Sequence, residues 1–107
     1  MQKYTTSDFE NNVIPEGETT LVIFSRKTCP VCQAVLNMFE TIVKDYEGKE
    51  ITFARIDSEE EKGLFAKLAL KGVPQALFYK DGLLVKKLSG KHEEDEYYDA
   101  IDEVLAD

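Results

Sequence analysis

Apolar and polar positions alternate along this chain between short strand-like runs and longer helix-like stretches. Thr20–Phe24 is a continuous, β-branched apolar run, which is typical of a strand covered by helices on both faces. Apolar residues then recur at three- and four-residue steps from Cys32 to Tyr46, and Gly48 follows. This spacing predicts a long amphipathic helix that packs one face onto the preceding strand.

The second half of the chain repeats the alternation. Ile51–Ile56 is a strand candidate, and the acidic run Glu59–Glu61 after Ser58 is predicted to open another helix, since acidic residues complement the positive end of a helix dipole. Two further apolar runs, Gln75–Tyr79 and Leu83–Leu88, are joined by Lys-Asp-Gly, which predicts a hairpin. A last helix is expected to turn inward the side chains of Tyr97, Ile101, Val104 and Leu105.

The N-terminal segment has the polar start of a short helix. Ser7 or Thr6 is available as its N-cap, with Glu10 at capping-box spacing from Ser7, and the helix should end by Pro15. A short strand at Gln2–Tyr4 is a further candidate. The alternation predicts an α/β fold: one domain over residues 1–107, with a central mixed sheet of four to five strands flanked by helices on both faces.

Charge and hydropathy narrow the function classes. The formal net charge is −8, from 21 acidic and 13 basic residues, which argues against a nucleic-acid partner. No apolar run approaches the roughly 18 residues that span a bilayer, and the N-terminal residues lack the apolar core of a signal peptide. We therefore expect a cytoplasmic protein with no membrane association. Structural disulfides are uncommon in that compartment, so two cysteines three positions apart call for another explanation.

The two cysteines stand between a predicted strand and a predicted helix. Pro30 follows Cys29 where the first helical residue should lie, which places Cys29 at or beside the N-cap. Free backbone N–H groups and the helix dipole there favour thiolate over thiol, and Arg26 and Lys27 act in the same direction. Cys32, one turn into the helix, is close enough to reach back to Cys29.

This spacing predicts a dithiol that exchanges with disulfides, and a CxxC between a strand and a helix is a known sequence rule for this chemistry. Half of a shared zinc site and a pair of inert thiols are the alternatives. Structural zinc needs four ligands, whereas the chain offers one histidine, His92, which is expected on the surface. We expect no metal and no cofactor.

The order of motifs resembles the thioredoxin family over nearly the whole chain. The motifs are Leu21–Phe24, Cys29-Pro30-Val31-Cys32, Phe53–Asp57, Gly72-Val73-Pro74, Lys80-Asp81-Gly82 and Gly90. The resemblance implies a thioredoxin fold and a thiol–disulfide oxidoreductase, with Cys29 as nucleophile and Cys32 as resolving thiol. It also implies protein disulfides as substrates and a disulfide reductase that recharges the pair.

The same resemblance assigns the substrate-binding residues. It implies that Pro74 is a cis-proline, that the backbone of Val73 pairs with the peptide beside a target disulfide, and that Gly90 lines the same surface. Such pairing is a form of strand addition. The alternative for Pro74 is a plain proline at the entry of a strand.

The chain also departs from the family pattern. A buried aspartate usually precedes the motif where Ile23 stands, and Arg55 is the counterpart of its basic neighbour. Thr28 replaces a common tryptophan, and Pro30 directly after the first cysteine, with Lys27 nearby, is more like a glutaredoxin. Two alternatives therefore stay open: a thioredoxin-fold binding module with little redox turnover, and a glutaredoxin-like reductase.

Overall fold

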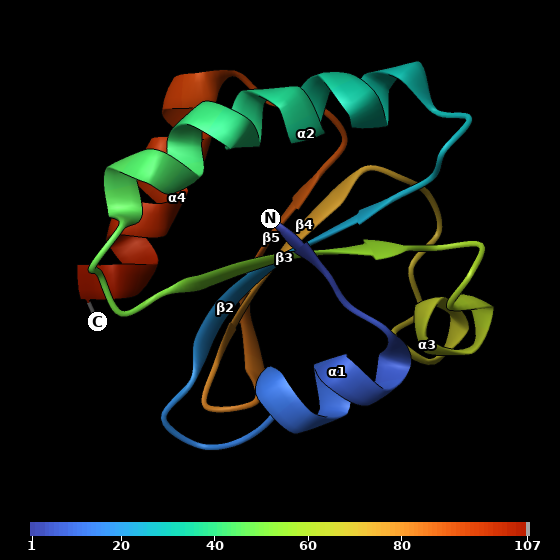
Figure 1. The fold of residues 1–107 in the computed structure, drawn as a ribbon, viewed down its shortest axis with the longest axis horizontal. Coiled ribbons are helices and arrows are strands. Elements are labelled where there is room, and N and C mark those ends of the chain that lie inside the picture. Colours follow the sequence, from blue (N-terminus) through green and yellow to red (C-terminus); the bar gives the residue numbers. More distant parts are fainter. Residues whose placement is uncertain (107) are drawn as a thin grey trace.

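The computed structural model describes residues 1–106 of the chain (Figure 1). Strands and helices alternate along these residues. In chain order they are β1 (Gln2–Lys3), α1 (Thr6–Asn12), β2 (Thr19–Ser25), α2 (Pro30–Ile42), a 3₁₀ helix η1 (Val43–Tyr46), β3 (Thr52–Asp57), α3 (Lys62–Lys67), β4 (Gln75–Lys80), β5 (Leu83–Ser89) and α4 (Glu94–Ala106).

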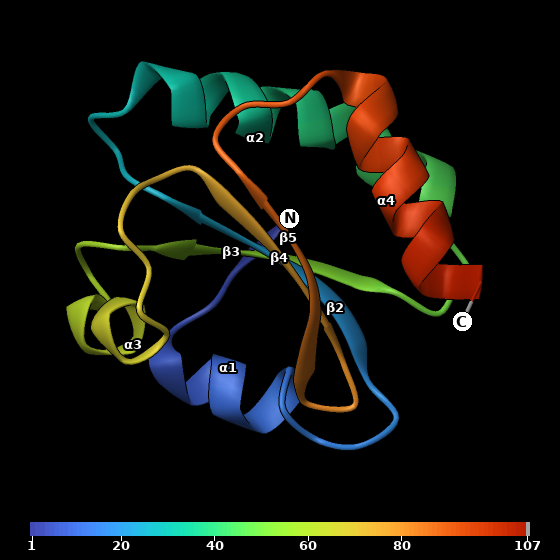
Figure 2. The same ribbon diagram turned by 180° about the vertical axis from the view of Figure 1, so that it is seen from behind.

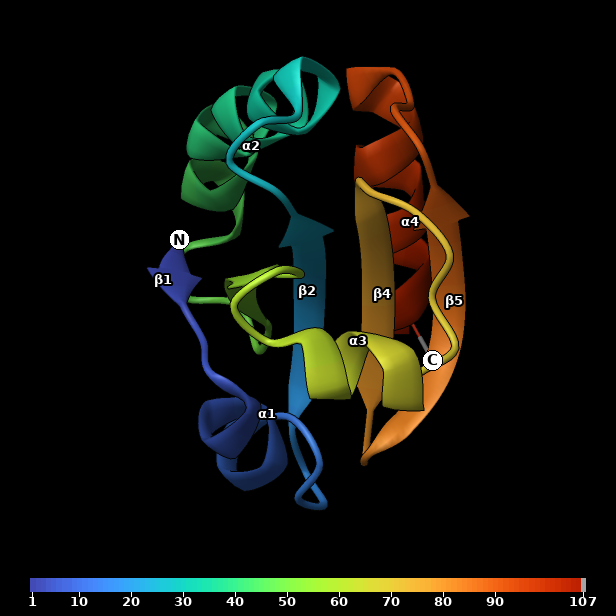
Figure 3. The ribbon, with the colours of Figure 1, turned by 90° about the vertical axis from the view of Figure 1, so that its right-hand side faces the viewer.

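The five strands form one mixed sheet in the order β1-β3-β2-β4-β5. β3 runs parallel to β1 and β2, whereas β4 runs antiparallel to β2 and β5. Helices α2 and α4 cover one face and helices α1 and α3 cover the other (Figures 1–3). This is the mixed, two-sided α/β architecture that the sequence predicts.

Two apolar clusters, one on each face, hold the layers together. Along β2, Leu21 and Ile23 pack in the cluster under α2 and α4, whereas Val22 and Phe24 pack in the cluster under α1 and α3. All four side chains have no exposed surface. Each such side chain contributes about 1.5–3 kcal/mol relative to an exposed one, which explains why Leu21–Phe24, the middle of this strand, is apolar at every position.

The predicted cap of the first helix is wrong. The N-cap is Thr5, whose hydroxyl accepts the N–H of Asp8 at 3.2 Å while Asp8 accepts the N–H of Thr5 at 2.9 Å. This capping box takes the place of the expected one between Ser7 and Glu10. Thr6 donates its hydroxyl to Glu61 at 2.8 Å instead, a contact between residues 55 positions apart.

The acidic run Glu59–Glu61 lies before α3 and not within its first turn, and only Glu61 reaches the helix, as its N-cap. Asp57 accepts the N–H groups of Glu59 and Glu60 at 2.8 and 3.0 Å, so the chain turns before α3 begins at Lys62. The predicted long helix is two helices in the structure. The α-helix α2 ends at Ile42, and the 3₁₀ helix η1 follows from Val43 to Tyr46. Gly48 then adopts a φ of +79°, a conformation that L side chains rarely adopt.

The two loops that concern the cysteines lie at one end of the sheet. Residues 26–29 connect β2 to α2, and residues 68–74 connect α3 to β4. Figures 1 and 2 both show these loops at the same end of the molecule, beyond the C-terminal end of β2. Across residues 1–106, no helix combines the length and the hydropathy that a bilayer crossing requires.

Candidate active site

Cys29 is the N-cap of α2. Its backbone is extended, with φ −109° and ψ 102°, and its Sγ accepts the N–H of Cys32 at 3.1 Å. Pro30 occupies the first helical position, where a proline costs no hydrogen bond. A sulfur held here faces the positive end of the α2 dipole, so any negative charge that develops on it is stabilised.

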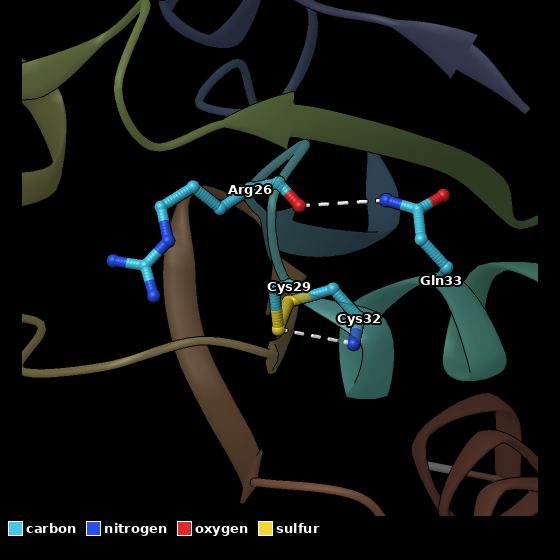
Figure 4. The surroundings of a disulfide bond; sticks show 4 residues. All are labelled: Arg26, Cys29, Cys32 and Gln33. Carbon is cyan, nitrogen blue, oxygen red and sulfur yellow. Dashed lines mark hydrogen bonds between the residues drawn. A yellow bond between two sulfur atoms is a disulfide. The ribbon is translucent and has the colours of Figure 1, made fainter.

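Cys29 and Cys32 are joined by a disulfide whose Cα atoms lie 5.2 Å apart (Figure 4). The two cysteines differ in exposure: Cys29 is half-buried, whereas Cys32 has no exposed surface. Figure 4 also shows the side chain of Arg26 pointing away from the sulfur atoms, while Gln33 donates its amide to the Arg26 carbonyl at 3.4 Å. An incoming molecule can reach only the first of the two sulfur atoms directly.

The segment before β4 carries the predicted proline. The peptide bond between Val73 and Pro74 is cis, Pro74 is buried, and Val73 is half-buried. The carbonyl of Pro74 accepts the N–H of Gly90 at 2.9 Å, and Ser89 donates its hydroxyl to Gln75 at 2.7 Å. These bonds place Gly90 beside Pro74.

Ile23 stands where the family pattern has an acid. Its side chain is fully buried, and the parallel register of β2 and β3 pairs it with Arg55, so both side chains lie on the α2 side of the sheet. Arg55 lines a polar hollow of about 380 Å³ together with Asp57 and Glu40. Arg55 therefore lies beside Ile23 in the sheet and shares its hollow with two carboxyl groups.

Lys27 takes part in an ion triad that the sequence analysis missed. Glu60 accepts from Lys27 at 3.0 Å and from Lys3 at 2.5 Å. The hydrogen bond to Glu60 raises the pKa of Lys27, and the bonds from Lys3 and Lys27 lower the pKa of Glu60. The triad ties the loop before α2 to β1 and to the turn after β3. The available signal was the acidic run itself, but its lysine partners lie more than 30 positions away.

The second missed feature lies next to Gly90. The ring of His92 contacts the carboxylate of Glu96 at 2.9 Å and the carbonyl of Ser89 at 3.0 Å. The spacing of His92 and Glu96, four residues apart at the start of a predicted helix, was the signal that could have found it. Within residues 1–106 no group of three or more histidine, cysteine, aspartate or glutamate side chains is placed to hold a metal ion.

Comparison with known proteins places these features in a family. The family model described as Thioredoxin matches residues 1–103. Thioredoxins of Staphylococcus aureus strains MW2 and N315 are each 29% identical to the chain over 103 residues, which is 96% of this chain and 96% of each relative. The chain therefore belongs to the thioredoxin family and carries the thioredoxin fold.

Proposed function

We propose that this chain reduces disulfides in other proteins, with Cys29 as the attacking thiolate and Cys32 as the resolving thiol. The difference in exposure between the two cysteines carries the proposal. Cys29 is accessible and receives an N–H hydrogen bond at the start of α2, whereas Cys32 is completely buried behind it. A thiolate is the nucleophile in disulfide exchange, so the accessible, stabilised sulfur is the one that attacks.

The reaction needs two exchanges. The Cys29 thiolate attacks one sulfur of the substrate disulfide, a mixed disulfide forms, and the first substrate thiolate leaves. Cys32 then loses its proton and attacks the Cys29 sulfur, which releases the second substrate thiolate and closes the Cys29–Cys32 disulfide. Two electrons have passed to the substrate. The structure has the pair in this closed, oxidised state.

Val73, Pro74 and Gly90 form the proposed substrate platform. Val73 is half-buried and precedes a cis peptide bond, and Gly90 is bonded to the Pro74 carbonyl at 2.9 Å. A substrate peptide laid along Val73 would gain main-chain hydrogen bonds, which recognise an extended backbone whatever its side chains. This mode of binding suits an enzyme that acts on disulfides in several proteins.

Removal of the proton from Cys32 must differ in this chain from the family pattern, because the usual buried acid is absent. Ile23 offers no base, and Oδ1 of Asp57 is engaged by two backbone N–H groups. The first substrate thiolate is released beside the cysteine pair, and we assign the proton of Cys32 to that leaving group or to water. Turnover then depends on the substrate more than it does where a buried acid is present.

The oxidised pair must be recharged. A disulfide reductase that supplies two electrons is the proposed partner, and the cytoplasm, which keeps thiols reduced, is the proposed location. The chain uses only its own sulfur atoms in this scheme and needs no cofactor.

Reduction of insulin tests the proposal. With dithiothreitol as electron donor, we expect the wild type to reduce insulin and Cys29→Ser to fall to the rate of dithiothreitol alone, because serine forms no disulfide. The matched variant Cys32→Ser keeps the nucleophile and, when dithiothreitol is left out, should accumulate a mixed disulfide with insulin. Equal rates for wild type and Cys29→Ser would end the proposal.

Ile23 favours a second candidate, a binding module that holds partners on the substrate platform with little redox turnover. Affinity capture separates the two. A redox enzyme retains partners on Cys32→Ser through bonds that a reductant breaks, whereas a binding module retains the same partners on a variant in which both cysteines are serine.

A further inference from the structure

We infer that His92, as an imidazolium, positions the Ser89–Gly90 side of the substrate platform and makes substrate binding depend on pH. The inference rests on the proposed function for its substrate and on the hydrogen bonds around His92 for its mechanism. We call these contacts the His92 clasp, which consists of His92, Ser89 and Glu96.

Both partners of the His92 ring are hydrogen-bond acceptors. Nε2 lies 3.0 Å from the carbonyl oxygen of Ser89, and Nδ1 lies 2.9 Å from Oε2 of Glu96. An imidazolium has two N–H groups and satisfies both acceptors, whereas a neutral imidazole has one N–H and leaves a lone pair facing an oxygen. The clasp is therefore complete only when His92 is protonated.

Hydrogen bonds of Ser89 and Gly90 connect the clasp to the substrate platform. The carbonyl that His92 holds belongs to Ser89, whose hydroxyl donates to Gln75, the residue after Pro74. The next residue, Gly90, donates its N–H to the carbonyl of Pro74 at 2.9 Å. These two bonds act beside the β4–β5 pairing of Ser89 with Gln75 and the hydroxyl of Tyr97, which donates to the Gly90 carbonyl at 3.5 Å. A shift of the Ser89 carbonyl away from His92 would disturb the bonds at Ser89 and Gly90.

The groups packed around the ring favour the charged form. α4 contributes the Glu96 carboxylate, whose other oxygen accepts the N–H of Glu93 at 3.0 Å, and the ring of Tyr97 edge-on at 6.0 Å. β5 contributes only the neutral Ser89 carbonyl. The hydrogen bond to Glu96 is the largest cause that raises the pKa of His92, and partial burial opposes it. Burial raises the pKa of Tyr97, which keeps that neighbour uncharged near neutral pH.

The direction of the pH effect follows from the raised pKa of His92. A group whose pKa is higher in the folded protein stabilises its folded contacts below its unfolded pKa, about 6.5 for histidine. That stabilisation is lost as the pH rises through the folded value. The substrate platform is therefore held firmly at mildly acidic pH and loosens in mildly alkaline solution.

The variant Glu96→Gln tests whether the hydrogen bonds of the clasp can form without a positive charge on His92. A glutamine can accept the Glu93 N–H with its oxygen and donate its NH₂ group to Nδ1 of a neutral His92, whose remaining N–H then bonds the Ser89 carbonyl. This variant should keep the clasp closed when His92 is neutral, and its side-chain oxygen can accept the Nδ1–H of the protonated ring. His92→Ala should open it at every pH, and Glu94→Gln, an exposed carboxylate two residues from Glu96, is the charge-matched control.

The test is the KM for insulin at about pH 6 and about pH 8.5, on either side of the ordinary histidine pKa. The ratio of the wild-type KM to the Glu96→Gln KM cancels the pH dependence of the cysteines. We expect this ratio to be near one at the lower pH and to rise roughly 3- to 10-fold at the higher pH, as loss of one hydrogen bond implies. Glu94→Gln should follow the wild type. A ratio that stays near one at both pH values overturns the inference.

A measurement independent of activity accompanies the kinetics. His92 is the only histidine in the sequence, so its NMR titration is unambiguous. The amide signal of Gly90 should move with the same midpoint in the wild type and stay still in His92→Ala. If insulin is reduced but Gly90 does not follow His92, the inference fails and the proposed function stands. If insulin is not reduced at any pH, the proposed function fails, and the positioning role of His92 fails with it. The NMR titration would still show whether protonation of His92 changes the hydrogen bonds of the clasp.

Discussion

At the scale of single residues, Ile23 most distinguishes this chain from the pattern of its family. Its side chain is fully buried and its β3 neighbour is Arg55, which lines a polar hollow with Asp57. An apolar residue here packs in the layer between β2 and α2, but it supplies no base for the proton that we propose Cys32 loses. On that proposal, the position exchanges catalytic assistance for packing.

Ile23→Asp should reverse that exchange. A carboxyl group buried at this position should cost about 1–3 kcal/mol of unfolding free energy, since it loses both packing and hydration. Arg55 beside it favours the ionised form, so the carboxylate can take the proton of Cys32. We expect lower stability in urea together with faster resolution of the mixed disulfide in a single-turnover experiment. Ile23→Asn, which matches aspartate in size without its charge, should lose the stability and gain no rate; equal rates for the two variants would exclude a role for the acid.

At the scale of elements, the sequence predicts what depends on local periodicity. The apolar run Thr20–Phe24 becomes β2, the three- and four-residue spacing after Cys29 becomes α2, and the Asp-Gly pair closes the β4–β5 hairpin. Contacts between distant segments were not predictable in this way. Thr6 donates a hydrogen bond to Glu61 across 55 positions, and the acidic run forms a turn on Asp57 before α3 begins at Lys62. The spacing of residues along one sequence does not show which charged side chains contact each other from distant segments.

The hairpin supplies an element-scale prediction. Gly82 has a φ of +78°, and a Cβ there would lie 2.3 Å from the Ile14 carbonyl oxygen. Gly82→Ala therefore meets both an unfavourable backbone conformation and a clash that only a backbone shift relieves. Gly48→Ala is the matched control, because its φ is +79° with no atom within 4 Å of the added Cβ. We expect about 1–2 kcal/mol lost in Gly48→Ala from conformation alone and clearly more in Gly82→Ala, measured by urea unfolding. Equal losses would show that Ile14 moves aside without cost.

At the scale of the whole molecule, the tyrosines report on the integrity of both layers. The chain has five tyrosines, and each has a raised pKa. Burial is the main cause for four of them, whereas a hydrogen bond to Asp45 raises the pKa of Tyr98 to about 12. Tyr46 donates to Asp102 at 2.8 Å and Tyr98 donates to Asp45 at 2.5 Å, so the two bonds cross between η1 and α4.

These shifts predict the alkaline limit of the fold. Because every tyrosine pKa is higher in the folded chain than the value of about 10 in an unfolded one, the contribution is complete below that value and is lost as the pH rises through the folded pKa values. In concentrated urea, phenolate absorbance should show the five groups ionising together near pH ~10. In native buffer, ionisation should begin at higher pH and coincide with loss of the circular dichroism signal, because Tyr97 and Tyr79 are nearly or fully buried and must be exposed before they ionise. Complete ionisation near the ordinary pKa with unchanged circular dichroism would show that the phenol groups reach solvent without unfolding, and that the packing of α4 on the sheet does not depend on them.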